Sequence, residues 1–406
     1  MGGSLEDTLF LPAERLRDFC AQTETPFFLY DAGTIRQRAA HWKAAFSFCR
    51  YRLAFPVRAL PNPHILRLLR ECGAGAVCAN GIELELARRA GYARSELIYL
   101  MHRPEKPPRG VQLILDDPEQ LRYLPKRLSV PVGLRYSPAE DVKVLPMTVL
   151  RTSRSQFGMN RDQLTEAALE LMERGCPAVG LHAQFATGRM ERAFYRVQAE
   201  TLFEAALHLH RWNVPLAYCD IGGGIGWSAS PNCAVNDVSG VAAEIRELYE
   251  KMLVSGGPGP VELRSQPGRS LAAPAGILVS RVESVRESGC TFLNLDASSS
   301  DMMRHILFGS CYGITLLGES QEEENTVSTI CGWLQENGDK FAKMQVLPKV
   351  KPGDLCIIRG VGAYAEAMNS PYGGNLRCAE YLLENGEIRM IRRRERPSEY
   401  FSTLIP

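Results

Sequence analysis

Short apolar runs alternate with amphipathic stretches along the chain after Pro26. Brief runs rich in β-branched and apolar residues are typical of buried strands, whereas apolar residues spaced three and four apart are typical of helices. Eight strands joined by helical crossovers predict an α/β fold, a (β/α)8 TIM-like barrel. The predicted strands are Arg52–Val57, Ala76–Ala79, Leu97–Leu100, Val111–Leu115, Pro131–Tyr136, Ala178–Gln184, Leu216–Ile221 and Val261–Arg264.

Helical periodicity fills most of the gaps between these strands. The predicted helices include Pro63–Cys72, Ile82–Ala90, Asp162–Arg174, Glu191–Trp212 and Val238–Leu253. Beyond about residue 270 the pattern becomes β-rich instead, in Gly276–Val285, Thr291–Leu295, Asp354–Arg359 and Cys378–Arg392. Within the last run, Asn385-Gly386 predicts a two-residue hairpin turn, because both residues tolerate positive φ.

The change of pattern predicts two domains. Residues 30–270 form the barrel, and residues 1–29 and 271–406 form a C-terminal β-sandwich or β-barrel domain that includes the strand-like run Pro26–Tyr30. A chain of 406 residues is long enough for both.

Composition narrows the range of partners. The 47 basic and 46 acidic side chains give a net charge of +1, which argues against nucleic acid or an anionic membrane as the partner. No apolar window has the length of a membrane span. The twelve cysteines form no C-x-x-C pair and follow no apolar signal segment, so we expect reduced thiols in a cytoplasmic protein.

A glycine-rich segment follows the seventh predicted strand, where Asp220-Ile221 leads into Gly222, Gly223 and Gly224. Glycines let backbone N–H groups approach a phosphate closely, so the segment is a candidate phosphate loop. A plain turn is the alternative. A dinucleotide loop fits less well, because it normally follows an early strand of a βαβ unit.

Five segments together carry a family resemblance: Thr25–Asp31, Ala54–Leu66, Cys219–Gly226, Gln266–Ser270 and Gly360–Ala367. Over nearly its whole length the chain resembles diaminopimelate and ornithine decarboxylases, which are pyridoxal-phosphate enzymes of the alanine-racemase-like fold (fold type III). The resemblance implies that Gly222, Gly223, Gly224 and Tyr364 contact the cofactor phosphate, with Tyr364 supplied across a homodimer interface. It also places His182 against the cofactor ring, although a histidine at a strand end can equally be a core residue.

Three departures from the family pattern affect its chemistry. Arg58 stands where the family has its Schiff-base lysine, and a guanidinium is always charged and cannot serve as the attacking amine. Gln266 replaces the glutamate that pairs with the pyridine nitrogen, which weakens the ring as an electron sink. Gly318 replaces the cysteine thought to return a proton to the α-carbon.

Other pocket positions keep the family's residues. Arg269 and Arg304 match arginines that hold substrate carboxylates, and Glu319 matches the acid that receives the distal amino group. Surface ion pairs are the alternative for Arg304 and Glu319. We expect no metal site, because His208 and His210 lie two apart on a helix and point to different faces.

Three functional hypotheses follow. The first is a decarboxylase-like pseudoenzyme or partner protein that binds a small amino-acid-type or phosphorylated ligand. The second is an enzyme of altered chemistry in an amino-acid-derived natural-product or siderophore pathway. The third is a working amino-acid decarboxylase with an amine from elsewhere, although no lysine occurs between Lys43 and Lys106. Pyridoxal phosphate would bind non-covalently at best under the first two.

Overall fold

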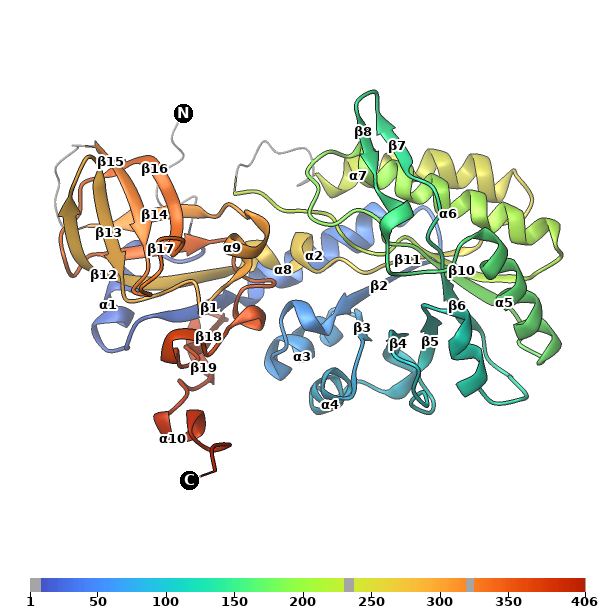
Figure 1. Ribbon diagram of the computed structural model, residues 1–406, viewed down its shortest axis with the longest axis horizontal. Coiled ribbons are helices and arrows are strands. Elements are labelled where there is room, and N and C mark those ends of the chain that lie inside the picture. Colours follow the sequence, from blue (N-terminus) through green and yellow to red (C-terminus); the bar gives the residue numbers. More distant parts are fainter. Residues whose placement is uncertain (1–8, 230–236, 319–324, 406) are drawn as a thin grey trace. The chain divides into compact units, whose positions relative to one another are not determined.

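The computed structural model describes residues 9–229, 237–318 and 325–405. The chain divides into two compact units, one of residues 35–271 and one that joins residues 1–34 to residues 272–406. Figure 1 shows the elements of both units.

Unit 35–271 is a closed parallel barrel, as the strand–helix alternation predicts. Its eight strands pair in the order β10-β11-β2-β3-β4-β5-β6-β9. The strands are β2 (Tyr51–Pro56), β3 (Gly75–Cys78), β4 (Leu97–Met101), β5 (Gln112–Leu115), β6 (Val132–Arg135), β9 (Val179–His182), β10 (Leu216–Asp220) and β11 (Glu262–Ser265). All eight predicted barrel strands are therefore confirmed within two residues or so at their ends.

Helices connect most of the barrel strands. They are α2 (Ala32–Ala45), α3 (Pro63–Glu71), α4 (Gly81–Arg89), α5 (Arg161–Glu173), α6 (Ala193–Arg211) and α7 (Val238–Leu248), with a π-helical turn at Tyr249–Val254. Side-chain caps begin several of them: Asn62 accepts from the His64 backbone N–H, and Asn80 accepts from that of Glu83. The two crossovers beside β5 lack an α-helix, and only a 3-10 turn at Pro118–Tyr123 lies between β5 and β6.

One aromatic side chain occupies much of the barrel interior. A Cβ atom on Gly180 would lie 2.1 Å from the Tyr218 Cζ, and one on Gly133 would lie 2.4 Å from the Tyr218 hydroxyl. The guanidinium of Arg264 covers the Tyr218 ring at 3.5 Å. Glycines on β6 and β9 thus make the space that this ring fills.

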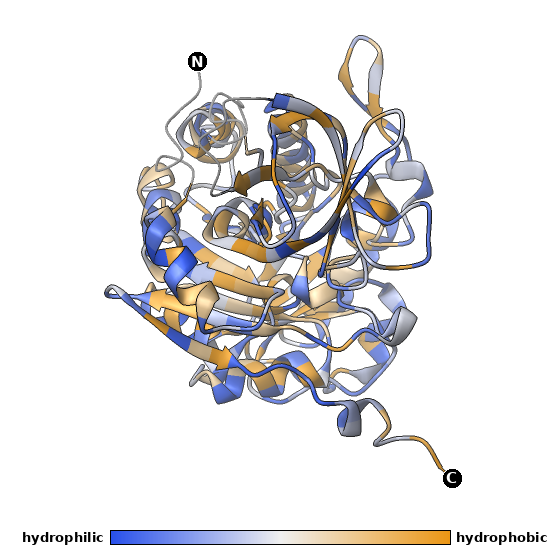
Figure 2. Ribbon diagram, turned by 90° about the vertical axis from the view of Figure 1, so that its left-hand side faces the viewer, coloured by the Kyte–Doolittle hydropathy of each residue, from blue (hydrophilic) through white to orange (hydrophobic). Residues whose placement is uncertain are grey.

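Unit 1–34/272–406 is a sheet of nine linked strands. They are β1 (Phe27–Asp31), β12 (Gly276–Glu287), β13 (Thr291–Leu295), β14 (Gly313–Leu317), β15 (Asn325–Cys331), β16 (Lys340–Pro348), β17 (Leu355–Arg359), β18 (Ala379–Glu384) and β19 (Glu387–Arg392). The long strand β12 pairs with β1 and β17 through its first half and with β13 through its second. This sheet confirms the predicted β domain. Hydrophobic residues concentrate along its strands in Figure 2.

Helix α1 (Ala13–Ala21) covers one face of this sheet. Phe19 meets Phe27 and Tyr381 edge to face at centroid distances of 5.5 and 5.1 Å. At the far edge, Asn385 and Gly386 have φ of 50° and 80° between β18 and β19, which confirms the predicted hairpin turn. All described cysteines are free thiols.

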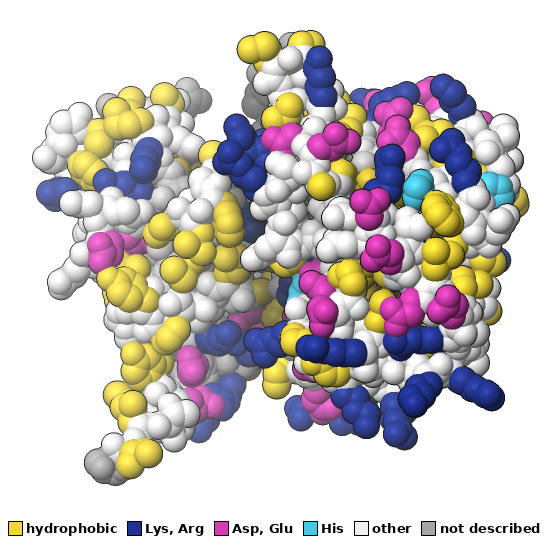
Figure 3. All heavy atoms as spheres, turned by 45° about the vertical axis from the view of Figure 1, so that its right-hand side comes forward, with side chains coloured by type: hydrophobic (Ala, Val, Ile, Leu, Met, Phe, Trp, Pro, Cys, Tyr) yellow, Lys and Arg dark blue, Asp and Glu magenta, His cyan; other side chains and the backbone are white. Residues whose placement is uncertain are grey.

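The surface carries both signs of charge. On the face seen in Figure 3, lysine and arginine side chains are interspersed with acidic ones. The near-zero net charge of the sequence therefore does not hide a strongly segregated surface on this face. No helix among the described residues is long and apolar enough to cross a membrane.

Gly180→Ala tests the packing of the barrel interior. The new methyl group would collide with the Tyr218 ring, so we expect a loss of about 1–3 kcal/mol in the free energy of unfolding, measured by denaturant titration. Gly81→Ala is the control, because nothing lies within 4 Å of its Cβ position. The double variant with Tyr218→Leu should recover part of the loss. Equal stability of Gly180→Ala and Gly81→Ala would contradict this packing.

A buried carboxylate in the β unit gives a second test. Burial, and then the neighbouring Glu380, raise the pKa of Glu366 to about 7, although Arg392 and Arg377 lie 3.8 and 3.7 Å away. Because the folded protein holds this proton more tightly than the unfolded chain, stability should fall as pH rises from about 4.5 to about 7.

Glu366→Gln should remove about 1–3 kcal/mol of that fall, measured as the difference in unfolding free energy between pH 5 and pH 8. Glu387→Gln, at an exposed position of β19, should leave the pH dependence as in the wild type. An unchanged slope in Glu366→Gln would show that this carboxylate does not titrate as described.

Candidate functional site

The candidate site lies at the carboxyl ends of the barrel strands. Arg58 sits in the 3-10 turn Val57–Ala59 directly after β2, His182 is the last residue of β9, and Gln266 follows β11. Gly222–Gly224 follow β10. Parallel strands of a barrel bring these ends to one edge, where barrel enzymes place their chemistry.

Four further polar residues at the same edge were missed in the sequence. His102 follows β4, Asp116 follows β5, Arg135 ends β6 and Asp220 ends β10. Each stands at the end of an apolar run, and this position is the feature of the sequence that could have indicated a site residue. Their partners lie on other strands, so the sequence alone gives no indication of the contacts.

His182 is wholly buried and both its ring nitrogens lack a hydrogen-bond partner. Burial lowers its pKa well below the usual value, and the charges of Arg135, Arg58 and His102 lower it further. The ring is therefore a neutral imidazole, and three charged or ionisable groups lie close enough to act on it. Buried polar atoms without partners are rare and point to a missing ligand or water.

Asp116 links two of these groups. Its Oδ1 accepts from Arg135 Nη1 at 3.2 Å and from the Gly158 backbone N–H at 3.0 Å, while its Oδ2 lies 2.7 Å from His102 Nδ1. The ring of Phe157 packs against both partners, 4.6 Å from the Arg135 guanidinium and 5.0 Å from the His102 ring centroid. Asp116 is thus fully engaged, and its single negative charge is shared between Arg135 and His102.

Arg58 has no such partner. Its Nη1 is buried without a hydrogen bond, and no carboxylate of the described residues lies within ion-pair distance. Arg58 as a whole is partly exposed, and Nη1 is the part of its guanidinium that is buried without a hydrogen bond, which carries a cost in the free protein. The barrel edge therefore carries a positive charge that an anionic ligand could neutralise.

Gln266 pairs with a carboxylate of its own chain. Its Nε2 donates to Asp220 Oδ2 at 2.7 Å, and the Gly222 backbone N–H donates to Asp220 Oδ1 at 2.9 Å. Burial raises the pKa of Asp220, and these two hydrogen bonds oppose the rise. One N–H of the Gln266 amide is therefore bonded to Asp220.

The glycines of the 222–224 loop have a packing reason of their own. Gly222 and Gly224 have φ of 65° and 90°, and a Cβ on either would lie 2.3 or 2.0 Å from the Ala183 or Ala186 carbonyl oxygen. A Cβ on Gly223 would lie 2.2 Å from the Gln266 carbonyl oxygen. The loop is thus tightly held against neighbouring strand ends, and its role toward phosphate stays a prediction.

The remaining predicted residues fall in different places. Arg269 begins α8 (Arg269–Ala272), and its Nη1 would lie 2.3 Å from a Cβ on Gly188. In the β unit, Arg304 begins α9 (Arg304–Phe308), and its guanidinium lies 4.8 Å from the Phe308 ring and 5.7 Å from the Tyr364 ring. The structure thus brings Arg304 and Tyr364 together.

Tyr364 has a left-handed backbone, with φ of 57°, which is uncommon for a residue other than glycine. Gly318 follows β14, and a Cβ there would lie 3.2 Å from an Asp354 carboxylate oxygen. Glu319 lies outside the described residues. Among the residues that the structure describes, no cluster of histidine, cysteine and carboxylate side chains could hold a metal ion.

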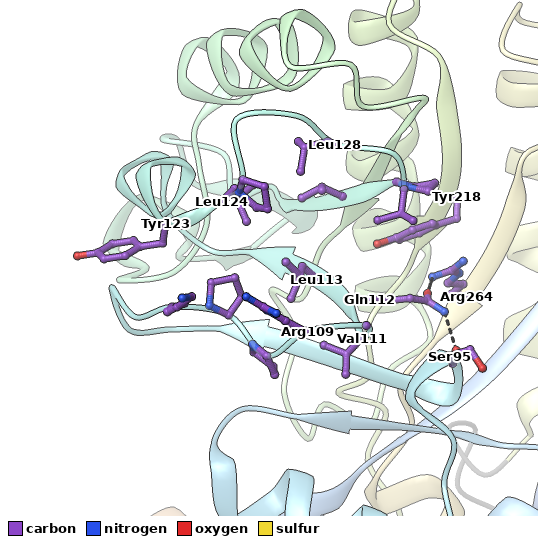
Figure 4. A pocket seen from close by; sticks show the side chains of 18 residues that line it. Ser95, Arg109, Val111, Gln112, Leu113, Tyr123, Leu124, Leu128, Tyr218 and Arg264 are labelled. Carbon is purple, nitrogen blue, oxygen red and sulfur yellow. Dashed lines mark hydrogen bonds between the residues drawn. The ribbon is translucent and has the colours of Figure 1, made fainter.

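A separate cavity opens at the other end of the barrel strands. It has a volume of about 820 Å³ and is lined by the first residues of β5 and β6, Gln112 and Val132, among mostly apolar neighbours. In Figure 4, Arg264 donates to Gln112, which in turn donates to the Ser95 carbonyl, at 2.6 and 3.0 Å. This cavity is distinct from the strand ends that carry the candidate site.

A closed parallel barrel with ionisable side chains at its carboxyl edge, followed in the chain by a second unit built on a β-sheet, defines the class of TIM-barrel proteins with a C-terminal β domain. Residues 32–273 match the family described as "Pyridoxal-dependent decarboxylase, pyridoxal binding domain". The chain belongs to this family, within the fold type III decarboxylases.

Curated relatives cover nearly the whole chain. "Protein TabA" of Pseudomonas amygdali pv. tabaci is 30% identical over 91% of this chain and 89% of its own length. Diaminopimelate decarboxylase of Methanothermobacter thermautotrophicus is 27% identical over the same shares. Among solved structures, the diaminopimelate decarboxylase of Helicobacter pylori complexed with L-lysine has a TM-score of 0.85 at 23% identity, over 95% of this chain and 98% of that one.

His182→Leu tests whether the buried imidazole is held ready for a ligand. Removing two unsatisfied polar atoms should raise the stability of the free protein by about 1–3 kcal/mol, measured by thermal unfolding without ligand. His208→Leu is the control, because His208 Nε2 lies 2.9 Å from the Thr165 hydroxyl and its loss should not stabilise. A destabilised His182→Leu protein would mark His182 as an ordinary core residue.

Proposed function

We propose that this decarboxylase-family protein binds a small amino-acid-type or phosphate-bearing ligand without a covalent bond, and that the family's standard pyridoxal chemistry is lost. The observation that carries the proposal is the Arg58 guanidinium, whose buried Nη1 has no hydrogen bond or counter-ion among the described residues, at the edge where the family's lysine is expected. A fixed positive charge suits a phosphate or carboxylate group.

Pyridoxal phosphate fits this edge in part. His182 offers a buried neutral ring to a flat aromatic ligand, Arg58 offers a charge, and the Gly222–Gly224 loop is the candidate for the phosphate. Tyr364 is the candidate second phosphate contact, supplied by a partner copy in the homodimer that we also propose. When bound, the cofactor supplies a ring that withdraws electrons from a substrate.

The residues fit the family's covalent chemistry poorly. Arg58 cannot form the bond that a lysine forms, and Gln266 brings a neutral amide where a carboxylate is expected. One N–H of the Gln266 amide also donates to Asp220, which leaves its other N–H and its oxygen, both uncharged, to face a ligand. Gly318 has no side chain to move a proton. These three positions together favour binding over the standard reaction.

An enzyme of altered chemistry is the second candidate. It is favoured by the relative named "Protein TabA", whose name is not that of a decarboxylase. His102 and Asp116 also place an ionisable pair at the strand ends, where barrel enzymes carry acid–base groups.

Arg58→Gln and Arg58→Lys test the proposal with pyridoxal phosphate as the probe. The wild type should bind the probe by calorimetry, yet give no protein-linked adduct by mass spectrometry after borohydride treatment. Arg58→Gln should weaken binding about tenfold or more, since a charge-assisted contact is lost. Arg58→Lys should give at most a minor trapped adduct, because Gln266 and Gly318 are unchanged.

Arg67→Gln, at an exposed position of α3, is the matched control and should bind as the wild type does. A trapped adduct in the wild type, or release of carbon dioxide from diamino acids by the wild type, would overturn the proposal. Restoring Lys, Glu and Cys together at positions 58, 266 and 318 should raise adduct formation and carbon dioxide release by more than the sum of the three single changes, because such residues act as a unit.

A further inference from the structure

His102 lies among the strand-end residues without a role in the family resemblance. It follows β4, and its side chain is 31% exposed, in contrast to the 7% of Asp116. Its Nδ1 lies 2.7 Å from Asp116 Oδ2, and its ring packs on Phe157. One ring nitrogen is thus fixed inside the barrel wall, while the ring remains partly open.

The Asp116 contact decides which nitrogen of the neutral ring carries the proton. An ionised carboxylate only accepts hydrogen bonds, so Nδ1 must be the donor. In the neutral imidazole, Nε2 then holds a lone pair and is an acceptor. Asp116 is itself fixed by Arg135 and by the Gly158 backbone N–H, so the ring orientation is set by a connected network.

The groups that face His102 are otherwise mostly positive. Asp116 is its carboxylate partner and also pairs with Arg135, and Arg135 and Arg58 both lie close enough to the uncharged His182 to lower its pKa, as His102 does. An anionic group of the ligand would therefore bind Arg58. His102 Nε2, whose ring is held by the Asp116 carboxylate, accepts hydrogen bonds, so it suits a hydrogen-bond donor of the ligand such as an amine.

We propose that His102 Nε2, held by Asp116, is a specificity-determining contact that accepts a hydrogen bond from an amine of the ligand, at a distance from the acidic group that Arg58 binds. This inference rests on the proposed function and deepens it. It assigns the amine to the barrel itself, whereas the family resemblance assigns it to Glu319.

The strand order gives the approximate distance between the two groups of the ligand that Arg58 and His102 would contact. β2, which leads to Arg58, and β4, which leads to His102, are separated by β3 alone. Adjacent strands lie about 4.8 Å apart, so these two strands are about 10 Å apart along the wall, and inward side chains shorten the gap. A chain of several carbons between acid and amine spans such a distance, so the amine in question is the distal one of a diamino acid.

L-lysine and L-norleucine form a matched pair of probes, because they differ in the terminal amine. The wild type should bind L-lysine about tenfold or more tightly than L-norleucine by calorimetry. His102→Phe keeps an aromatic ring beside Phe157 but has no acceptor nitrogen. Asp116→Asn keeps the size of the side chain but no longer fixes the proton of His102 on Nδ1. Both variants should bring the ratio of the two dissociation constants close to one.

His210→Gln and Glu319→Gln complete the set. His210 is exposed near the end of α6, so its variant should keep the wild-type ratio. A ratio that collapses in Glu319→Gln but persists in His102→Phe would overturn the inference in favour of the family's residue. Arg58→Gln should weaken both probes alike, because both carry the carboxylate.

A nitrogen-15 spectrum of the histidines gives a readout that needs no ligand and no activity. When the His102 ring is neutral, the wild-type spectrum should show a protonated Nδ1 and an unprotonated Nε2, and Asp116→Asn should mix the two tautomers. A protonated Nε2 in the wild type would overturn the inference by itself. Arg58-dependent binding of pyridoxal phosphate without a preference for lysine would overturn it while the proposed function stands, and absence of all binding would overturn both.

Discussion

The positive charge of Arg58 at the carboxyl edge of the barrel is the constraint on which the site depends. A guanidinium cannot shed its proton, so the protein can lower the cost of this charge only with a counter-ion or with water. Asp116, a carboxylate at the same edge, is already shared by Arg135 and His102. Arg58 therefore keeps a charge that no carboxylate of the described residues pairs with, and the pKa of the neighbouring His182 is lowered by burial and by this charge.

The rest of the barrel holds this arrangement rigidly. Tyr218 fills the interior against Gly133 and Gly180, and Arg264 covers its ring. At the carboxyl edge, the 222–224 loop approaches the carbonyl groups of Ala183 and Ala186 so closely that only glycine fits. Close packing on both sides leaves the strand-end side chains few alternative positions, which is what a pre-organised binding site requires.

Much of the architecture could be predicted from the sequence, because it depends on local pattern. The eight barrel strands are short apolar runs between amphipathic helices, and the Asn385-Gly386 turn depends on two residues alone. The Asp116 network could not be predicted in this way. Its members come from β4, β5, β6 and the turn before α5. The parallel pairing of these neighbouring strands, and the return of the chain to Gly158, bring them together.

The glycine loop shows why a motif can leave its role open. Phosphate binding and tight packing both require glycine at these positions, and the structure supplies the packing reason directly. The same reasoning separates Gln266 from Arg58. The Gln266 amide donates to Asp220, so a contact within the chain accounts for it without a ligand. The buried Nη1 of Arg58 has no partner among the described residues, and a charge that these residues leave unpaired is the stronger argument for a ligand.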